Sequence, residues 1–194
     1  MKRIFDRIED TIAKKGRCVM AIDGPCGSGK STLAAILAQR HGGEVIPMDD
    51  FFLPPYLRTG KRLTEKGGNI HYERFEQEVV KNIGSGRVEW GAFDCSVMDI
   101  TGRKRTEGKR LIIAEGSYSL HPKFGKYYDF AVFCTVGLEE RLKRIEKRSG
   151  KEKLYTFISL WIPMEEEYFK TFDIEKKCLF RVTGEKNMFT AEEI

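Results

Sequence analysis

Three glycines and a proline stand just before a lysine and two hydroxyl residues near the start of the chain. Residues 24–31 read Gly-Pro-Cys-Gly-Ser-Gly-Lys-Ser and match the pattern G-x-x-x-x-G-K-[ST] at every position. Glycine lets successive backbone N–H groups turn inward and keeps side chains away from an approaching anion. The pattern predicts a phosphate-binding loop, in which Lys30 reaches the β- and γ-phosphates of ATP and the Ser31 hydroxyl ligates Mg²⁺.

The flanks of this loop support the same prediction. A short apolar run over 18–23 precedes it, and a helix is expected from about residue 30, with its positive dipole end directed at the phosphates. A glycine-rich turn that carries its lysine and serine by chance is the alternative, and it explains neither flank. The residues expected to bind ATP are Gly24, Pro25, Cys26, Gly27, Ser28, Gly29, Lys30, Ser31 and Thr32.

Cys26 lies inside the predicted loop and has two interpretations. Nearby amides and Lys30 could lower the pKa of its thiol and make it reactive. We favour the simpler interpretation, a small inert side chain. The five cysteines of the chain are scattered and form no CxxC pair, so we expect neither a disulfide framework nor a zinc site.

Acidic residues stand at the ends of two further apolar runs. Asp49 and Asp50 follow the run over 44–48, and Glu115 stands near the end of the run over 110–116. Because parallel strands hold ligands at their carboxyl ends, Asp49 and Glu115 are expected beside the phosphate-binding loop. Phosphoryl transfer to an alcohol needs a base, predicted as Asp49, and metal ligands, predicted as Ser31, Glu115 and Asp49. The alternatives are that Asp49 and Asp50 only form a turn or an N-cap, and that Glu115 is an exposed charge at a strand end.

A basic helix is expected over 138–148, followed by a flexible break. Its ordinary interpretation is a solvated face, but arginines on a mobile segment could close over the phosphates, balance their charge and exclude water. We favour such a lid, at about 141–153, for one or two of the basic residues. The basic residues of this segment are Arg141, Lys143, Arg144, Lys147, Arg148, Lys151 and Lys153.

Strands and helices alternate along the chain, and the expected strands are apolar throughout. This pattern predicts a parallel sheet covered on both faces, in the α/β class. The strands are expected at 18–23, 44–48, 110–116, 129–136 and 177–182. We predict a single three-layer α/β/α domain of the P-loop NTPase type over residues 1–194, with a five-stranded parallel sheet in the order 2-3-1-4-5. A small β-hairpin lobe at about 86–108 and the lid complete it.

The composition of the 194 residues limits the classes of partner. A net charge of +5 with 41% hydrophobic residues fits a folded protein with a small anionic ligand. No apolar run reaches the ~20 residues of a membrane span, and no basic stretch with interleaved aromatic residues indicates nucleic acid. We expect a cytoplasmic protein with neither partner; whether it forms a homo-oligomer is left open. The sequence has no N-K-x-D motif, which disfavours a GTPase.

Several segments, in order, resemble the uridine kinase, phosphoribulokinase and pantothenate kinase group of P-loop kinases. They are "GPCGSGKST", "MDDFF", "IIAEG", "ERLKRIEKR" and the helix "WIP…EEYF", spread over about residues 21–182. The resemblance implies that Asp49 is the catalytic carboxylate, and that Glu115 supports Mg²⁺. It also implies that Arg141, Arg144 and Arg148 lie where lid arginines are expected, and on this ground we predict a catalytic role for Arg141 and Arg144.

The resemblance further implies an acceptor site. "AFDC" is similar to the aromatic-Asp step beside the acceptor pocket, which makes Phe93 and Asp94 candidate substrate residues, together with Arg148. Where uridine kinases carry a ribose-binding Asp, this chain has His71 and Glu73, and where they carry a base-reading His, it has Val97 and Met98. We expect ATP- and Mg²⁺-dependent phosphorylation of a hydroxyl on a small molecule, first of all a nucleoside. A kinase for pantothenate or a sugar phosphate and a nucleotide-binding regulator without transferase activity are the alternatives.

Overall fold

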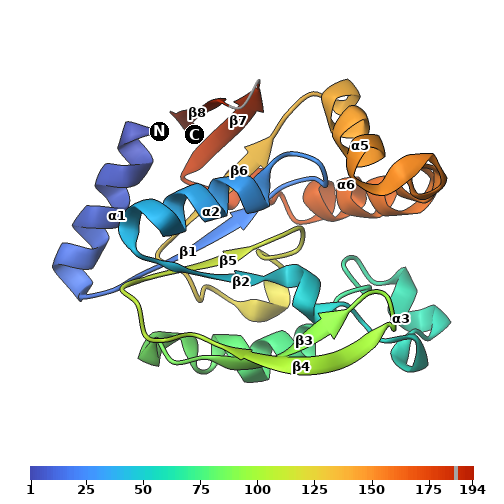
Figure 1. Ribbon diagram of the computed structural model, residues 1–194, viewed down its shortest axis with the longest axis horizontal. Helices are drawn as coiled ribbons and strands as arrows, with labels where there is room; N and C mark the ends of the chain where they lie inside the picture. The colour runs from blue at the N-terminus through green and yellow to red at the C-terminus, as the bar shows by residue number, and fades with distance from the viewer. Residues whose placement is uncertain (186–187) are drawn as a thin grey trace.

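Six strands form one sheet through the middle of the protein, in the order β2-β5-β1-β6-β7-β8 (Figure 1). The computed structural model describes residues 1–185 and 188–194. The first five strands in this order run parallel, and β8 pairs antiparallel with β7. The strands are β1 (Cys18–Asp23), β2 (Glu44–Pro47), β5 (Leu111–Glu115), β6 (Phe130–Thr135), β7 (Phe180–Glu185) and β8 (Met188–Glu193).

The predicted order of five parallel strands is confirmed, and one strand was missed. β1 and β5 are buried along their whole length, as expected for strands that are covered on both faces. β8 is mostly exposed and reads Met-Phe-Thr-Ala-Glu-Glu, so it lacks the continuous apolar run from which the other strands were predicted. Its pairing covers the edge of β7.

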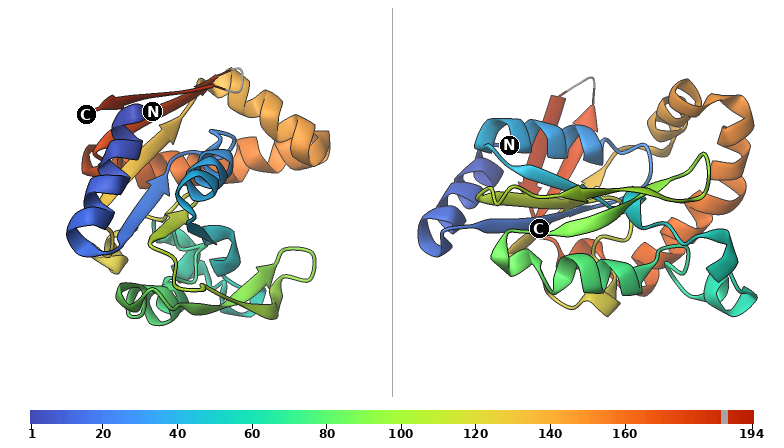
Figure 2. Two further views of the ribbon diagram at one scale, coloured as in Figure 1. Left: turned by 60° about the vertical axis from the view of Figure 1, so that its left-hand side comes forward. Right: turned by 60° about the horizontal axis from the view of Figure 1, so that its bottom comes forward.

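Helices cover both faces of the sheet (Figures 1 and 2). Ile8 of α1 and Leu37 of α2 belong to the apolar core on one face, while Phe75 and Tyr168 belong to the core on the other. The α-helices are α1 (Lys2–Lys15), α2 (Lys30–His41), α3 (Gly60–Thr64), α4 (Tyr72–Arg74), α5 (Leu138–Thr156) and α6 (Ile162–Thr171). Two π-helical segments are η3 (Phe75–Val80) and η6 (Phe157–Trp161).

Short 3₁₀ helices and a hairpin make up most of the connections. The 3₁₀ helices are η1 (Met48–Phe51), η2 (Pro55–Leu57), η4 (Ile83–Ser85), η5 (Pro122–Phe124) and η7 (Glu175–Lys177). The predicted hairpin is β3 (Glu89–Asp94) and β4 (Asp99–Arg105), a separate antiparallel pair that lies below the main sheet in Figure 1. The carboxylate of Glu44, at the start of β2, accepts from the backbone N–H of Lys109 at 3.1 Å and so holds this end of the hairpin near the sheet.

The segment predicted as a lid lies within α5. The backbone leaves helical geometry at Gly150, where φ is 82° and ψ is 165°, a conformation essentially restricted to glycine. The chain then continues through η6 into α6, with a proline in the first turn of α6. Across the described part of the chain, every helix is too short or too polar to cross a bilayer.

Candidate functional site

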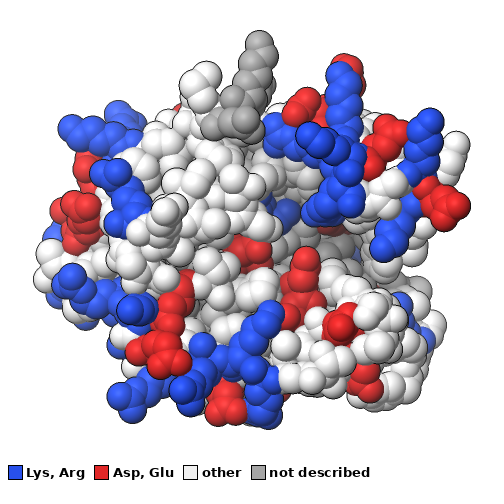
Figure 3. All heavy atoms as spheres, viewed as in Figure 1, with Lys and Arg blue, Asp and Glu red and all other residues white. Residues whose placement is uncertain are grey.

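A pocket of about 630 Å³ opens beyond the carboxyl ends of β1, β2 and β5. Residues from α5, η6 and α6 line one side of it, and residues from the loop after β2 and from the hairpin line another. Basic side chains gather over α5 at the upper right of Figure 3. The predicted phosphate-binding loop forms part of the wall.

The phosphate-binding loop joins β1 to α2, and three of its glycines have positive φ angles. These angles are 139° at Gly24, 76° at Gly27 and 99° at Gly29. A Cβ atom at Gly24 would lie 2.0 Å from the backbone oxygen of Cys134, and one at Gly27 would lie 2.9 Å from that of Arg141. Glycine is therefore required both by the turn itself and by close packing against β6 and α5.

Lys30 begins α2 and reaches back across the loop. Its side chain is buried, and its Nζ donates to the backbone oxygens of Gly24 at 2.8 Å and Pro25 at 3.0 Å. Lys30, Ser31 and Thr32, the first residues of α2, all line the pocket. A helix N-terminus with an ammonium group beside it favours an anion such as a phosphate chain.

Asp49 and Glu115, predicted from the ends of two strands, line the same pocket. Glu115 pairs in register with Pro47 of β2 and with Ile22 of β1, so neighbouring parallel strands bring the acids to the loop. Glu115 is buried, whereas Asp49 is exposed toward the pocket. Desolvation raises the pKa of both carboxyls, and the ammonium of Lys30 opposes the increase in each case.

The chemistry of these acids fits Mg²⁺ bound together with a nucleotide. The Ser31 side chain lowers the pKa of the Glu115 carboxyl, and both residues line the pocket, so two oxygen ligands lie near each other there. No three His, Cys, Asp or Glu side chains of the described residues form a group that could hold a metal. Mg²⁺ commonly takes one or two carboxylates and completes its shell with waters and substrate phosphates, so Ser31, Glu115 and Asp49 are a suitable donor set.

Glu165 of α6 and Ser117 after β5 also line the pocket, and the sequence analysis missed both. The Glu165 carboxylate accepts from the backbone N–H of Cys26 at 2.8 Å and from the Ser117 hydroxyl at 2.7 Å. The Ser117 hydroxyl also lies 3.0 Å from the backbone oxygen of Gly24 and 3.4 Å from the Nζ of Lys30. These contacts fasten α6 to the phosphate-binding loop.

The spacing in α6 contains a signal that could have found Glu165. The buried residues of this helix are Ile162, Glu165 and Tyr168, three apart and therefore on one face. A carboxylate between two buried positions is uncommon unless it has partners. The neighbouring glutamates in the sequence obscure this pattern, because three of them follow one another.

The three predicted lid arginines have different surroundings. Arg141 is buried, does not line the pocket, and donates from Nε to the backbone oxygen of Cys26 at 2.9 Å. It therefore supports the loop, in place of the catalytic role predicted for it. Arg144 and Arg148 line the pocket, and Arg148 lowers the pKa of Asp49. Of the three, Arg148 is the one whose charge acts on the predicted base.

The surroundings of Cys26 favour an inert thiol. Burial, followed by the negative charge of Glu165, raises its pKa to about 12, although Arg141 opposes the change. The thiol is consequently protonated at neutral pH, and a protonated thiol is a poor nucleophile. This agrees with the simpler of the two sequence-based interpretations.

One part of the pocket is aromatic. Its members are Phe52 from the loop after β2, Phe93 from the hairpin, and Phe157 and Trp161 from η6. The rings of Phe52 and Phe93 meet edge to face, with centroids 6.2 Å apart. Such a surface suits a flat ring, and Phe93 lies in the pocket as the sequence analysis predicted.

Two other predicted substrate residues do not line this pocket. Asp94 accepts from the backbone N–H of Ser96 at 2.7 Å and from its hydroxyl at 2.6 Å, so it shapes the hairpin turn. His71 caps α4, lies 3.2 Å from Glu73 and borders a separate cavity. The prediction that Asp94 and His71 hold the substrate is corrected accordingly, because local turn and cap bonds direct both side chains elsewhere.

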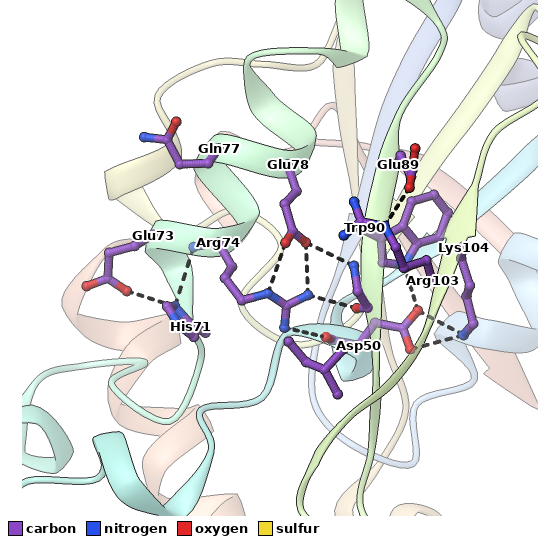
Figure 4. Close-up of polar contacts among 12 residues, drawn as sticks. Asp50, His71, Glu73, Arg74, Gln77, Glu78, Glu89, Trp90, Arg103 and Lys104 are labelled. Atoms are coloured by element: carbon purple, nitrogen blue, oxygen red, sulfur yellow. Dashed lines mark hydrogen bonds and ion pairs between the residues drawn. The ribbon is translucent and has the colours of Figure 1, made fainter.

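Asp50 has a structural role, unlike the adjacent Asp49, which lines the pocket. It is buried and accepts from Nε1 of Trp90 at 2.8 Å and from Nζ of Lys104 at 2.9 Å (Figure 4). The guanidinium of Arg74 donates to the backbone oxygen of Asp50 at 3.2 Å and to that of Gly91, in the hairpin, at 2.7 Å. These bonds hold the hairpin, which carries Phe93, against the segment that carries Asp49.

Comparisons with known proteins agree on the architecture. No protein-family model matches the chain. A cytidylate kinase of Archaeoglobus fulgidus is 27% identical over 182 residues, which are 90% of this chain and 89% of that kinase. A tRNA dimethylallyltransferase of Elusimicrobium minutum is 24% identical over 173 residues, 85% of this chain and 56% of that enzyme. The solved structure of a possible uridine kinase from Bacillus stearothermophilus has a TM-score of 0.64 at 19% identity, covering 91% of this chain and 97% of its own.

Proposed function

We propose that this chain, which has the fold of the P-loop kinases, transfers the γ-phosphoryl group of ATP to a hydroxyl group of a nucleoside-like small molecule. One observation carries the proposal: a single pocket contains the phosphate-binding loop with Lys30, the acids Asp49 and Glu115, and an aromatic wall that includes Phe93. A regulator that only binds nucleotide needs the loop but has no need of a base such as Asp49 beside it.

Each residue has a distinct part in the proposed reaction. Asp49 accepts the proton of the acceptor hydroxyl while that oxygen bonds to the γ-phosphorus and the bond to ADP breaks. Lys30 and Arg148 balance the negative charge of the transferring group. Ser31 and Glu115 hold Mg²⁺, which when bound neutralises charge on the β- and γ-phosphates. Closure of α5 over the pocket excludes water, which would otherwise compete with the acceptor.

The cytidylate kinase among the relatives favours a second candidate, a nucleoside monophosphate acceptor. Arg58 lines the pocket and offers a guanidinium that could hold an acceptor phosphate. In that reaction the attacking group is a phosphate oxygen, which is largely deprotonated at neutral pH and needs no general base. The presence of Asp49 in the pocket is the reason that we place the alcohol acceptor first.

An acceptor panel tests the proposal. Purified protein with Mg²⁺ and ATP is assayed for ADP release with uridine, cytidine, CMP, pantothenate or no acceptor, and mass spectrometry identifies the phosphorylated product. We expect acceptor-dependent ADP release with a nucleoside. Release with CMP alone would favour the second candidate, and release that no acceptor stimulates would contradict phosphoryl transfer to a small molecule.

The pH profile is expected to report the ionisation of Asp49. Only the ionised carboxylate can accept a proton, so kcat/KM should fall as the pH drops through its pKa. Desolvation by the surrounding pocket wall, together with Asp50 and Glu165, raises the pKa of Asp49, and Lys30 and Arg148 lower it, with the net direction upward from 3.8. The acid limb should therefore lie above pH 3.8.

Removing one of the opposing charges gives the matching test. Arg148→Gln should shift the acid limb of kcat/KM to higher pH, because the guanidinium no longer stabilises the Asp49 carboxylate. Circular dichroism over the same pH range separates this titration from acid unfolding. An acid limb that stays in place in this variant would argue against Asp49 as the titrating group.

A further inference from the structure

Charged side chains hold one residue of the phosphate-binding loop, Cys26, through both of its backbone polar groups. Its N–H donates to the carboxylate of Glu165 at 2.8 Å, and its carbonyl oxygen accepts from Nε of Arg141 at 2.9 Å. Both charged side chains are only 7% exposed. Hydrogen bonds to ionised groups are roughly twice as strong as those between neutral groups. The peptide groups on both sides of Cys26 are therefore restrained.

The two charged side chains also form a buried pair with each other. The guanidinium of Arg141 and the carboxylate of Glu165 approach to 3.9 Å, which is too far for a direct hydrogen bond. Each instead bonds to the backbone of Cys26. Two opposite charges with hydrogen-bond partners are less costly to bury than one charge alone. The proposed reaction assigns neither of them a part.

Glu165 also reaches the lysine of the loop through one intermediate. Its carboxylate accepts from the Ser117 hydroxyl at 2.7 Å, and the Ser117 oxygen lies 3.4 Å from Nζ of Lys30. The contacts of this one carboxylate thus extend to the backbone of the loop and to the ammonium group that would meet the phosphates.

The helix α5 packs directly on the loop at the same place. A Cβ atom at Gly27 would lie 2.9 Å from the backbone oxygen of Arg141. Arg141 lies near the start of α5 and Glu165 near the start of α6, and the chain between them passes through Gly150 and η6. One residue of the loop therefore fastens both ends of the segment that lines this side of the pocket.

We propose that Arg141 and Glu165 are positioning residues that hold the phosphate-binding loop in its nucleotide-binding shape before ATP arrives. This inference rests on the proposed function, in which the loop binds ATP, and adds to it the groups that set the shape of the loop. A loop that is ordered in advance loses less conformational entropy when phosphates bind, which strengthens binding. The sign of the effect is diagnostic for Glu165. A negative charge near a phosphate site by itself weakens the binding of an anion, so only its hydrogen bonds can strengthen it.

Two substitutions, Glu165→Met and Glu165→Gln, separate the hydrogen bonds from the charge. Methionine removes both, whereas glutamine removes the charge and still offers an oxygen to the N–H of Cys26. Calorimetry measures the affinity of each protein for a non-hydrolysable ATP analogue with Mg²⁺. We expect Glu165→Met to weaken binding by about tenfold, and Glu165→Gln to bind at least as tightly as the native protein. Glu166→Met is the matched control, because Glu166 is the next residue of α6 and is exposed, so its loss should leave the affinity unchanged.

Arg141→Lys tests the other member of the pair. Lysine keeps the positive charge but lacks the planar group whose Nε binds the carbonyl oxygen of Cys26. We expect this variant to weaken binding of the analogue by about three- to tenfold, although the net charge is the same. Circular dichroism melts establish that each variant is folded at the temperature of the titration, and Arg141→Lys keeps the test decisive where Glu165→Met does not fold.

The outcomes separate this inference from the proposed function. Native or tighter affinity in Glu165→Met, or native affinity in Arg141→Lys, would overturn the inference. Equal losses in Glu165→Met and Glu165→Gln would also overturn it, because the hydrogen bond to Cys26 would then contribute nothing. A native protein that binds the analogue but phosphorylates no acceptor would contradict the proposed function and leave the inference intact. A native protein that does not bind the analogue would contradict both.

Discussion

Asp49→Asn is expected to lower kcat by about 10²–10⁴-fold, the range in which a general base contributes. Asparagine keeps the size of the side chain and one oxygen atom, but it cannot take the proton of the acceptor hydroxyl. ATP binding should persist, because Asp49 follows β2 and is not part of the phosphate-binding loop. Steady-state kinetics at saturating nucleoside and titration with a fluorescent ATP analogue measure the two effects separately.

Asp50→Asn is the adjacent control. Its carboxylate binds Trp90 and Lys104, so the substitution should lower the melting temperature and reduce kcat far less than Asp49→Asn does. We therefore expect the loss of kcat to be large in the Asp49 variant, and the loss of stability to be large in the Asp50 variant. A normal kcat in the Asp49 variant, or an equal loss of kcat in both, would remove the assignment of Asp49 as the base.

Lys30→Met should weaken ATP binding and lower kcat/KM by about 10²–10³-fold or more, the loss seen when one preorganised charge-stabilising donor is removed. Methionine keeps a long apolar stem in the buried position but lacks the ammonium that lies at the mouth of the loop. Because Lys30 lowers the pKa of Asp49 and Glu115, the acid limb of any residual activity should also move to higher pH.

Lys143→Met is the matched control for this variant. Lys143 lies on the exposed face of α5, where it pairs with Glu139 at 2.7 Å, so its loss should leave ATP affinity unchanged. Calorimetric titration with a non-hydrolysable ATP analogue and Mg²⁺ compares the two proteins. Equal affinity in the Lys30 variant and the native protein would place the phosphates somewhere other than the proposed loop.

The sequence sufficed for the loop, the order of the parallel strands and the two acids at strand ends. In each case the signal is local. The loop is eight consecutive residues, the inner strands are uninterrupted apolar runs, and Asp49 and Glu115 directly follow or end such runs. A general property of parallel sheets, that their carboxyl ends share one edge, then brings these local features together. The strand β8 escaped prediction because an exposed edge strand carries no such run.

The sequence alone determined that this protein has a phosphate-binding loop with acids beside it, because short stretches of consecutive residues specify both the loop and the strand ends that carry the acids. Only the tertiary structure decided which neighbouring side chain faces the pocket. Asp49 opens toward it while Trp90 and Lys104, about 40 and 54 positions further along, hold Asp50 away from it. Glu165 is held at the pocket in the same way, through contacts with Cys26 and Ser117 in distant segments. The direction of a side chain depends on the packing of elements far apart in the chain, and no local pattern records that packing.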